Sequence, residues 1–200
     1  SLPVIDPDRT EFGYARTRCA CRACTDHCRT TPGPLVPADL DRLAPVADGE
    51  AAVLAWAEVH LRASPGAMLL RVYADGRREF YEVKTLVPAR SLAAAAAGAG
   101  PCHWLDHRGR CEVHAVAPFG CAFFDGHQTK AEGDERSLAG LHATEAAFQA
   151  DDLYARVWAH LDARGLRGEA VEHHEADVVA GAGVLGPGVA EADDEEWLGH

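Results

Sequence analysis

The sequence lacks a hydrophobic stretch of the length that a membrane-spanning helix needs, which is about 20 residues. The alanine-rich run at residues 92–100 is short and is interrupted by Gly98. Nothing in the sequence resembles a signal peptide. We therefore expect a cytoplasmic protein with no membrane partner. In that reducing compartment, clustered cysteines indicate metal or redox chemistry rather than disulfides.

The sequence is also poor in positive charge. Its 19 Lys and Arg residues stand against 31 Asp and Glu residues, which gives a formal net charge of −12 at pH 7. A protein that binds the phosphate backbone of a nucleic acid needs a basic face. We therefore expect no nucleic-acid partner.

Cysteine is absent from most of the chain, because all seven cysteines fall in two groups. They are Cys19, Cys21, Cys24 and Cys28 in the first group and Cys102, Cys111 and Cys121 in the second. Thiolates packed this closely repel one another unless a cation holds them, and soft sulfur ligands select zinc, copper(I) or iron–sulfur centres. An odd number of cysteines would also leave one thiol outside a pure disulfide framework. We therefore predict that the two groups fold together as a metal site, with all seven cysteines as candidate ligands.

Positive charge is concentrated around the first cysteine group. The arginines there are Arg9, Arg16, Arg18, Arg22 and Arg29. No Lys or Arg follows Arg167, so the C-terminal end is acidic and is typical of a solvated tail. The arginines can offset a net-anionic metal site, or they can attract an anionic substrate.

Hydrophobic periodicity and turn residues predict an α+β fold: a small, mainly helical domain with a β-hairpin and a cysteine-lined metal core. Two early helices are expected at residues 37–44 and at about residues 48–63, where Ser64-Pro65-Gly66 would end the second. Alternating segments at 68–73 and 78–83 flank a glycine-containing turn and predict the hairpin. A last helix is expected to begin near Ser137 or Leu141 and to end just before Gly165.

The composition divides the chain into three parts. Residues 1–18 have little periodicity and predict an irregular N-terminal arm, whereas residues 19–167 form the metal-binding domain with its C-terminal helix. Residues 168–200 are glycine-broken and acidic, and they predict a loosely structured tail. Within the domain, residues 111–114 are typical of a strand, and residues 126–133 are typical of an exposed polar loop.

The spacing of the first cysteine group does not match the common named metal sites. Cys21-x2-Cys24 lets two thiolates reach one ion through a tight turn, but redox and zinc motifs share this pair. A zinc ribbon would have a second Cys-x2-Cys, which is absent, and the bacterial ferredoxin run is absent too. The gaps from Cys21 to Cys28 also stand in the reverse order from the Cys-x3-Cys-x2-Cys run of radical S-adenosylmethionine enzymes.

In combination, the motifs resemble those of the YkgJ-like cysteine-cluster proteins, the CxxCxxCC zinc- or iron-chelating family. The matching segments are Cys21-x2-Cys24-x2-His27-Cys28, Cys102-His-Trp-Leu105, Gly109-Arg-Cys111-Glu-Val-His114 and Ala117-Pro118-x2-Cys121-x2-Phe124. The resemblance covers about residues 19–124. It implies zinc or iron chelation, and members of the family are often described as iron–sulfur oxidoreductases.

The chain departs from that family pattern at three positions. Cys19 is additional, His27 stands where the family has a cysteine, and Ala117 replaces the usual arginine. His27 can still ligate, because imidazole replaces thiolate in both zinc and iron–sulfur sites. The alternative is a surface histidine beside a site made of cysteines alone, with Cys19 as the compensating ligand. His27 therefore joins the seven cysteines as a candidate metal ligand.

Three functions fit these observations. The first is an iron–sulfur or iron-dependent metalloenzyme that performs redox chemistry on a small molecule. The second is a structural zinc module or metal carrier without catalysis, and the third is a partner-binding protein whose metal only holds the fold. Seven cysteines exceed the four ligands of one tetrahedral zinc, which favours a multinuclear cluster or two sites. We therefore favour the first function with an iron–sulfur cluster as cofactor and zinc as the alternative; the sequence indicates no catalytic residue and no oligomeric state.

Overall fold

The computed structural model describes residues 8–19, 21–30, 32–91, 100–169 and 179–181. These residues form an α+β fold, as predicted, and none of their helices is both long and apolar enough to cross a membrane. The elements follow in the order β1 (Thr10–Glu11), β2 (Tyr14–Ala15), α1 (Arg22–Thr30), α2 (Pro37–Leu43), η1 (Val46–Asp48), α3 (Glu50–His60), β3 (Leu61–Tyr73), β4 (Arg78–Pro88), η3 (His114–Val116), α4 (Phe119–Ala122), α5 (Lys130–Gln149), α6 (Leu153–Ala163) and β5 (Val179–Gly181).

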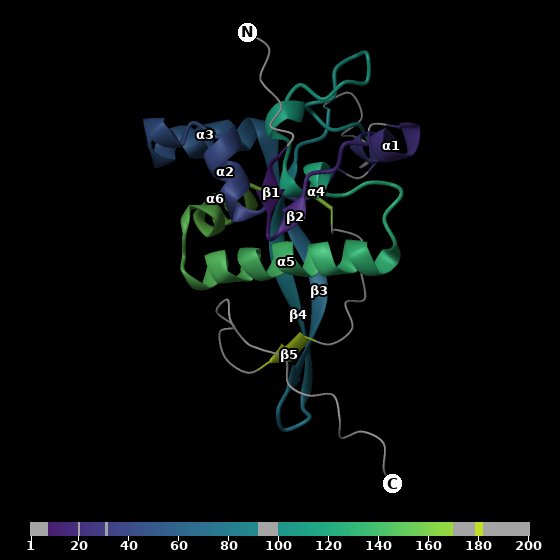
Figure 1. Ribbon diagram of the computed structural model, residues 1–200. Coiled ribbons are helices and arrows are strands. Elements are labelled where there is room, and N and C mark those ends of the chain that lie inside the picture. The colour runs from purple at the N-terminus through teal and green to yellow at the C-terminus, as the bar shows by residue number, and fades with distance from the viewer. Residues whose placement is uncertain (1–7, 20, 31, 92–99, 170–178, 182–200) are drawn as a thin grey trace.

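The β3–β4 hairpin runs through the middle of the molecule, and α5 crosses it (Figure 1). In that view α2, α3 and α6 lie on one side of the hairpin, and α1 lies on the other. The hairpin was predicted, but its strands are longer than expected, because they pair from Leu61 and Pro88 to Val72 and Arg78.

The segment Ser64-Pro65-Gly66 does not end a helix, as we expected, but forms a bulge inside β3. Gly66 has a φ of +85°, and a Cβ at this position would stand 1.7 Å from the carbonyl oxygen of Val83. Only glycine fits this bulge, since it has no side chain to meet the neighbouring strand. The bulge explains why a helix-breaking sequence lies within a strand.

Both ends of the described chain add strands that the sequence did not predict. Thr10–Glu11 pairs with Tyr14–Ala15 in a segment for which an irregular arm was expected. Val179–Gly181 pairs in parallel with Arg71–Tyr73 of β3, so the sheet order is β4-β3-β5. Part of the tail predicted to be loosely structured is therefore paired with the sheet.

The long C-terminal helix that we predicted is two helices. Asp151 has a φ of +49°, and the carboxylate of Asp152 accepts hydrogen bonds from the backbone N–H groups of Tyr154 and Ala155, at 2.8 and 3.3 Å. This cap begins α6 and separates it from α5. At its own start, α5 has a Thr129–Glu132 capping box, so it begins at Lys130 rather than near Ser137.

The predicted strand at residues 111–114 is wrong, because this segment is a turn that leads into the 3-10 helix η3. The buried Arg16 guanidinium donates hydrogen bonds to the carbonyl oxygens of Ala115 and His114, so it holds η3 against the N-terminal segment. The short α4 then begins at Phe119.

Two buried polar side chains connect the elements that lead to the cysteines. The Tyr154 hydroxyl accepts a hydrogen bond from the Leu86 N–H and donates one to the Leu35 carbonyl oxygen, each at 2.7 Å. The Asp39 carboxylate accepts hydrogen bonds from Val36 at 2.9 Å and Phe119 at 2.8 Å. Asp39 therefore joins the start of α2 to the start of α4, which carries Cys121.

Candidate metal centre

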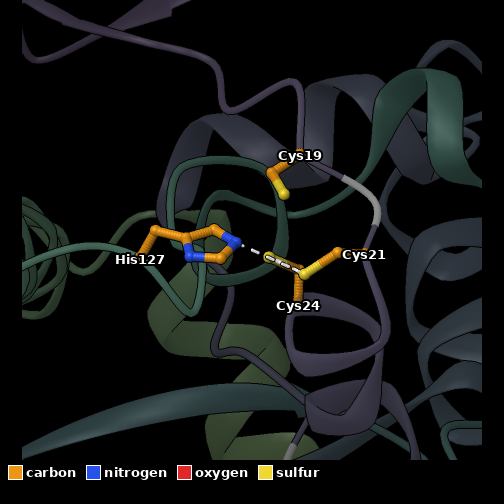
Figure 2. Close-up of side chains that lie close together, drawn as sticks. All are labelled: Cys19, Cys21, Cys24 and His127. Atoms are coloured by element: carbon orange, nitrogen blue, oxygen red, sulfur yellow. Dashed lines mark hydrogen bonds between the residues drawn. The ribbon is translucent and has the colours of Figure 1, made fainter.

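Four side chains from two distant segments meet beside α1: Cys19, Cys21, Cys24 and His127 (Figure 2). Their three sulfur atoms and one ring nitrogen all lie within 4.8 Å of one another. In a tetrahedral zinc site with Zn–S bonds of about 2.3 Å, neighbouring sulfurs stand about 3.8 Å apart. The set is therefore compact enough to hold one metal ion.

The two segments are joined by hydrogen bonds that place His127 opposite the cysteines. The Thr17 N–H donates to the Ala122 carbonyl oxygen at 2.9 Å, and the Thr17 hydroxyl donates to the Asp125 carboxylate at 2.6 Å. The other Asp125 oxygen accepts from the His127 N–H at 2.8 Å. The two bonds to the carboxylate lower the pKa of Asp125, and the bond from the Thr17 hydroxyl has the larger effect. The carboxylate thus orders the loop that carries His127.

Direct contacts already connect the candidate ligands. The sulfur of Cys21 lies 3.6 Å from that of Cys24 and 3.4 Å from Nε2 of His127. The Gly126 N–H donates to the Cys24 sulfur at 3.3 Å. Figure 2 shows the His127 ring pointing toward the two sulfurs from the opposite side.

The surroundings shift the pKa values of two neighbouring thiols in opposite directions. The backbone N–H of Cys24 and the His127 ring lower the pKa of Cys21 to about 6. The Gly126 N–H lowers the pKa of Cys24, but desolvation and the sulfurs of Cys19 and Cys21 together outweigh it and raise that pKa to about 11. One thiolate at neutral pH thus opposes ionisation of the next, and a bound cation would allow the whole set to ionise.

The site is open to solvent on one side. Cys21 and His127 are exposed, while Cys19 and Cys24 are half-buried. An open hollow of about 360 Å³ lies beside Cys19 and His127, and its charged lining includes Arg18 and Glu132. A metal ion can therefore reach these ligands without a large movement of the fold.

The compact set contains three of the seven cysteines that we predicted as ligands. The other four are Cys28, Cys102, Cys111 and Cys121, and they gather in the interior near the end of α1. Within the described ranges, no second group of three or more ligand atoms meets the 4.8 Å limit. The structure therefore divides the cysteines between a compact surface set and a more widely spaced interior group.

Two histidines bear on the site, His27 and His127, and the structure describes the side chain of only the second. The side chain of His27 lies outside the described part of the structure, so its predicted ligation stays a prediction. His127 was missed, because residues 126–133 were interpreted as an exposed polar loop. The cysteine spacing does not point to it, and its place in a short loop soon after Cys121 was the available signal.

Comparison of the chain with protein-family models, with curated proteins and with solved structures found no match. The resemblance to the YkgJ-like family therefore depends on the cysteine motifs themselves. The four ligand atoms and their spacing indicate metal binding independently of that resemblance.

Proposed function

We propose that this protein binds zinc through Cys19, Cys21, Cys24 and His127. The observation that carries the proposal is the 4.8 Å limit on the distances among three sulfurs and one ring nitrogen. Three cysteines and one histidine are a regular donor set of structural zinc sites. A sulfide-bridged iron cluster places several ions between its ligands and needs a wider set. The compact geometry therefore supports one ion better than a cluster.

The zinc ion would stabilise the fold rather than perform catalysis. Four protein ligands complete a tetrahedral site, whereas catalytic zinc keeps one position for water or substrate. Both oxygens of the nearby Asp125 carboxylate accept hydrogen bonds from Thr17 and His127, which gives this carboxylate a structural task. The ion would tie the segment before α1 to the loop between α4 and α5.

Membership of the YkgJ-like family is part of this proposal. Cys21-x2-Cys24, the first half of the family motif, supplies two of the proposed ligands. The implied zinc or iron chelation agrees with the donor set. The family's final cysteine pair corresponds to His27 and Cys28. Cys28 is not part of the compact set, so the additional Cys19 and His127 would complete the site.

A metal carrier is a second candidate, and the exposure of Cys21 and His127 favours it. An ion at an open site can pass to an acceptor by ligand exchange. The two functions differ in how fast zinc leaves: a structural ion should transfer to a chromogenic chelator only as fast as the protein opens. Transfer at a rate that rises with chelator concentration would favour the carrier.

Metal analysis of protein purified without oxygen tests the proposal. His127→Ala and Cys21→Ser should each lower the zinc content by about one ion per chain. His142→Ala removes another exposed histidine, from α5, and should leave the zinc content unchanged. Zinc content that is equal in wild type and His127→Ala would contradict the proposal.

A further inference from the structure

Four cysteines remain once the compact set is assigned: Cys28, Cys102, Cys111 and Cys121. All are free thiols, and they are buried or half-buried. A buried free cysteine often serves only as a small hydrophobic side chain. If packing were their only role, these thiols would be scattered through the core. Their arrangement relative to one another therefore distinguishes a packing role from a chemical one.

Backbone contacts bring three of these residues together. The Cys102 N–H donates to the Cys28 carbonyl oxygen at 2.8 Å, which joins α1 to the second cysteine segment. Leu105 forms an antiparallel bridge with Cys111, and its N–H donates to the Cys102 carbonyl oxygen at 3.0 Å. A short loop therefore folds Cys102 and Cys111 back toward each other beside the end of α1.

Close backbone packing places Cys121 in the same region. Its sulfur lies 3.9 Å from the Gly33 carbonyl oxygen, and the Gly120 N–H donates to the Pro34 carbonyl oxygen at 3.0 Å. A Cβ on Gly33 would stand 2.1 Å from the Gly120 carbonyl carbon, so only glycine permits this approach. The chain just after α1 thus holds α4, and with it Cys121, near Cys28.

The four thiols lie within one another's electric fields. Burial is the main cause that raises the pKa of Cys102 to about 12 and that of Cys111 to about 11. The charge of Cys28 raises both values further, and Cys102, Cys28 and Cys111 add to the effect of burial on the pKa of Cys121. Scattered core cysteines would not influence one another in this way.

Arginines lie close enough to offset thiolate charge in this group. The attraction of Arg29 acts on Cys28, that of Arg90 on Cys102 and that of Arg16 on Cys111, in each case lowering the pKa. The arginines therefore fit a site whose sulfurs carry negative charge when a metal is bound.

We infer that Cys28, Cys102, Cys111 and Cys121 form a second metal site, separate from the first and built from four thiolates. Its ligand is a thiophilic metal centre, a chemistry that a zinc ion and a sulfide-bridged iron cluster share. The interior sulfurs are spaced more widely than the surface set within the described residues, which favours the cluster. The inference goes beyond the proposed zinc function and does not depend on it, because the two sites share no ligand.

The interior site is also where an iron–sulfur redox function would reside. Cys102 is 7% exposed and adjoins the buried Trp104 in the same core cluster. Burial and the surrounding charges are levers on the reduction potential of such a cluster. The surface set, by contrast, is compact and open to solvent.

A variant that disables only the surface site tests the inference. Cys21→Ser combined with His127→Ala changes two exposed side chains, and circular dichroism would confirm that the fold is kept. The protein is purified without oxygen and then supplied in parallel with ferrous iron plus sulfide or with zinc alone. Iron, sulfide and zinc are measured in each sample.

We expect the double variant to keep about one metal centre per chain, either as a brown iron–sulfide species or as one zinc ion. Either result supports the inference, and the two arms distinguish the metals. A folded double variant that binds neither metal would overturn it. If instead the zinc proposal fails while this inference holds, wild type and double variant will contain equal amounts of metal.

Cys111→Ser provides the reciprocal test. This variant should lose the interior centre and keep the surface zinc. Adding His127→Ala to it should then remove the remaining zinc. If Cys111→Ser does not fold, the double variant still decides the question by itself. Metal in the double variant that persists when Cys111→Ser is added would contradict the inference.

Discussion

The two groups of thiols in this protein contain the same side chain in opposite surroundings. The surface set is compact and exposes Cys21 and His127 to solvent, and the pKa of Cys21 is lowered to about 6. The interior group is more widely spaced, and burial raises the pKa of every member. Nearby N–H groups and a histidine ring thus favour the thiolate form of Cys21, whereas burial favours the protonated form of the interior thiols.

One helix serves both groups. Cys24 and Cys28 stand one turn apart on α1, about 6 Å along its axis. The first contacts Cys21 and the Gly126 N–H, while the backbone of the second contacts Cys102. Position along the helix, rather than the choice of face, therefore assigns each cysteine to its group.

Removal of all metal should have the largest effect. Thiolates that lose their cation repel one another or take up protons, so the melting temperature should fall by more than about 10 °C. Differential scanning calorimetry before and after anaerobic chelation measures this change. Chelator presaturated with zinc is the control, and an unchanged melting curve for verified metal-free protein would contradict metal-linked folding.

Serine substitutions in metal-free protein separate the two groups next. Cys102→Ser buries a hydroxyl in an apolar site and should lower the free energy of unfolding by about 1–3 kcal/mol. Cys21→Ser changes an exposed position and should alter it by no more than about 0.5 kcal/mol. Urea unfolding under reducing conditions measures both values. Equal losses would remove the distinction between an interior and a surface group.

Alkylation rates give a sharper comparison. In metal-free protein, pH 7 is above the pKa of Cys21, which is about 6, so Cys21 is mainly thiolate. The same pH is far below the pKa values of Cys102 and Cys111, so these two thiols stay protonated. Cys21 should therefore react with iodoacetamide at least about tenfold faster, even though a thiolate of low pKa is less nucleophilic.

The pH dependence of that reaction has a definite sign. A lowered pKa means that the Cys21 rate should fall only as the pH drops through about 6. His127→Ala removes one cause of the lowering and should move the midpoint upward, while His142→Ala should not. Peptide mapping by mass spectrometry follows each cysteine separately, and a midpoint unaffected by His127→Ala would contradict the described contact.

The smallest expected effect concerns the support of the His127 loop. Asp125→Asn keeps the shape of the side chain but weakens its bonds to Thr17 and the His127 N–H, and it should reduce zinc affinity about tenfold. Competition with a zinc chelator measures the affinity. Asp75→Asn, in the distant hairpin turn, is the matched control. No change at Asp125 would mean that the metal alone orders the loop.

Local patterns predicted much of the fold. The helix that begins at Pro37 and the centre of the hairpin follow from a proline in the first turn and from alternating residues. The bulge at Gly66 and the break at Asp151 were missed, because each depends on how neighbouring elements pack. A helical repeat continues across Asp151 in the sequence, although the chain turns there.

The candidate site was only partly visible in the sequence. Clustered cysteines indicated metal chemistry through their residue type alone. The division into two groups depends on contacts across the fold, such as that of Cys28 with Cys102, which spacing does not encode. His127 reaches the site through its loop and the Thr17–Asp125 hydrogen bond, a pairing of distant residues.

Anomalous diffraction at the zinc edge, from crystals grown without oxygen, tests the central claim most directly. We predict a zinc peak bonded to the sulfurs of Cys19, Cys21 and Cys24 at about 2.3 Å and to the His127 ring nitrogen at about 2.0–2.1 Å. A map of zinc-loaded protein with no peak among these four atoms would contradict the account.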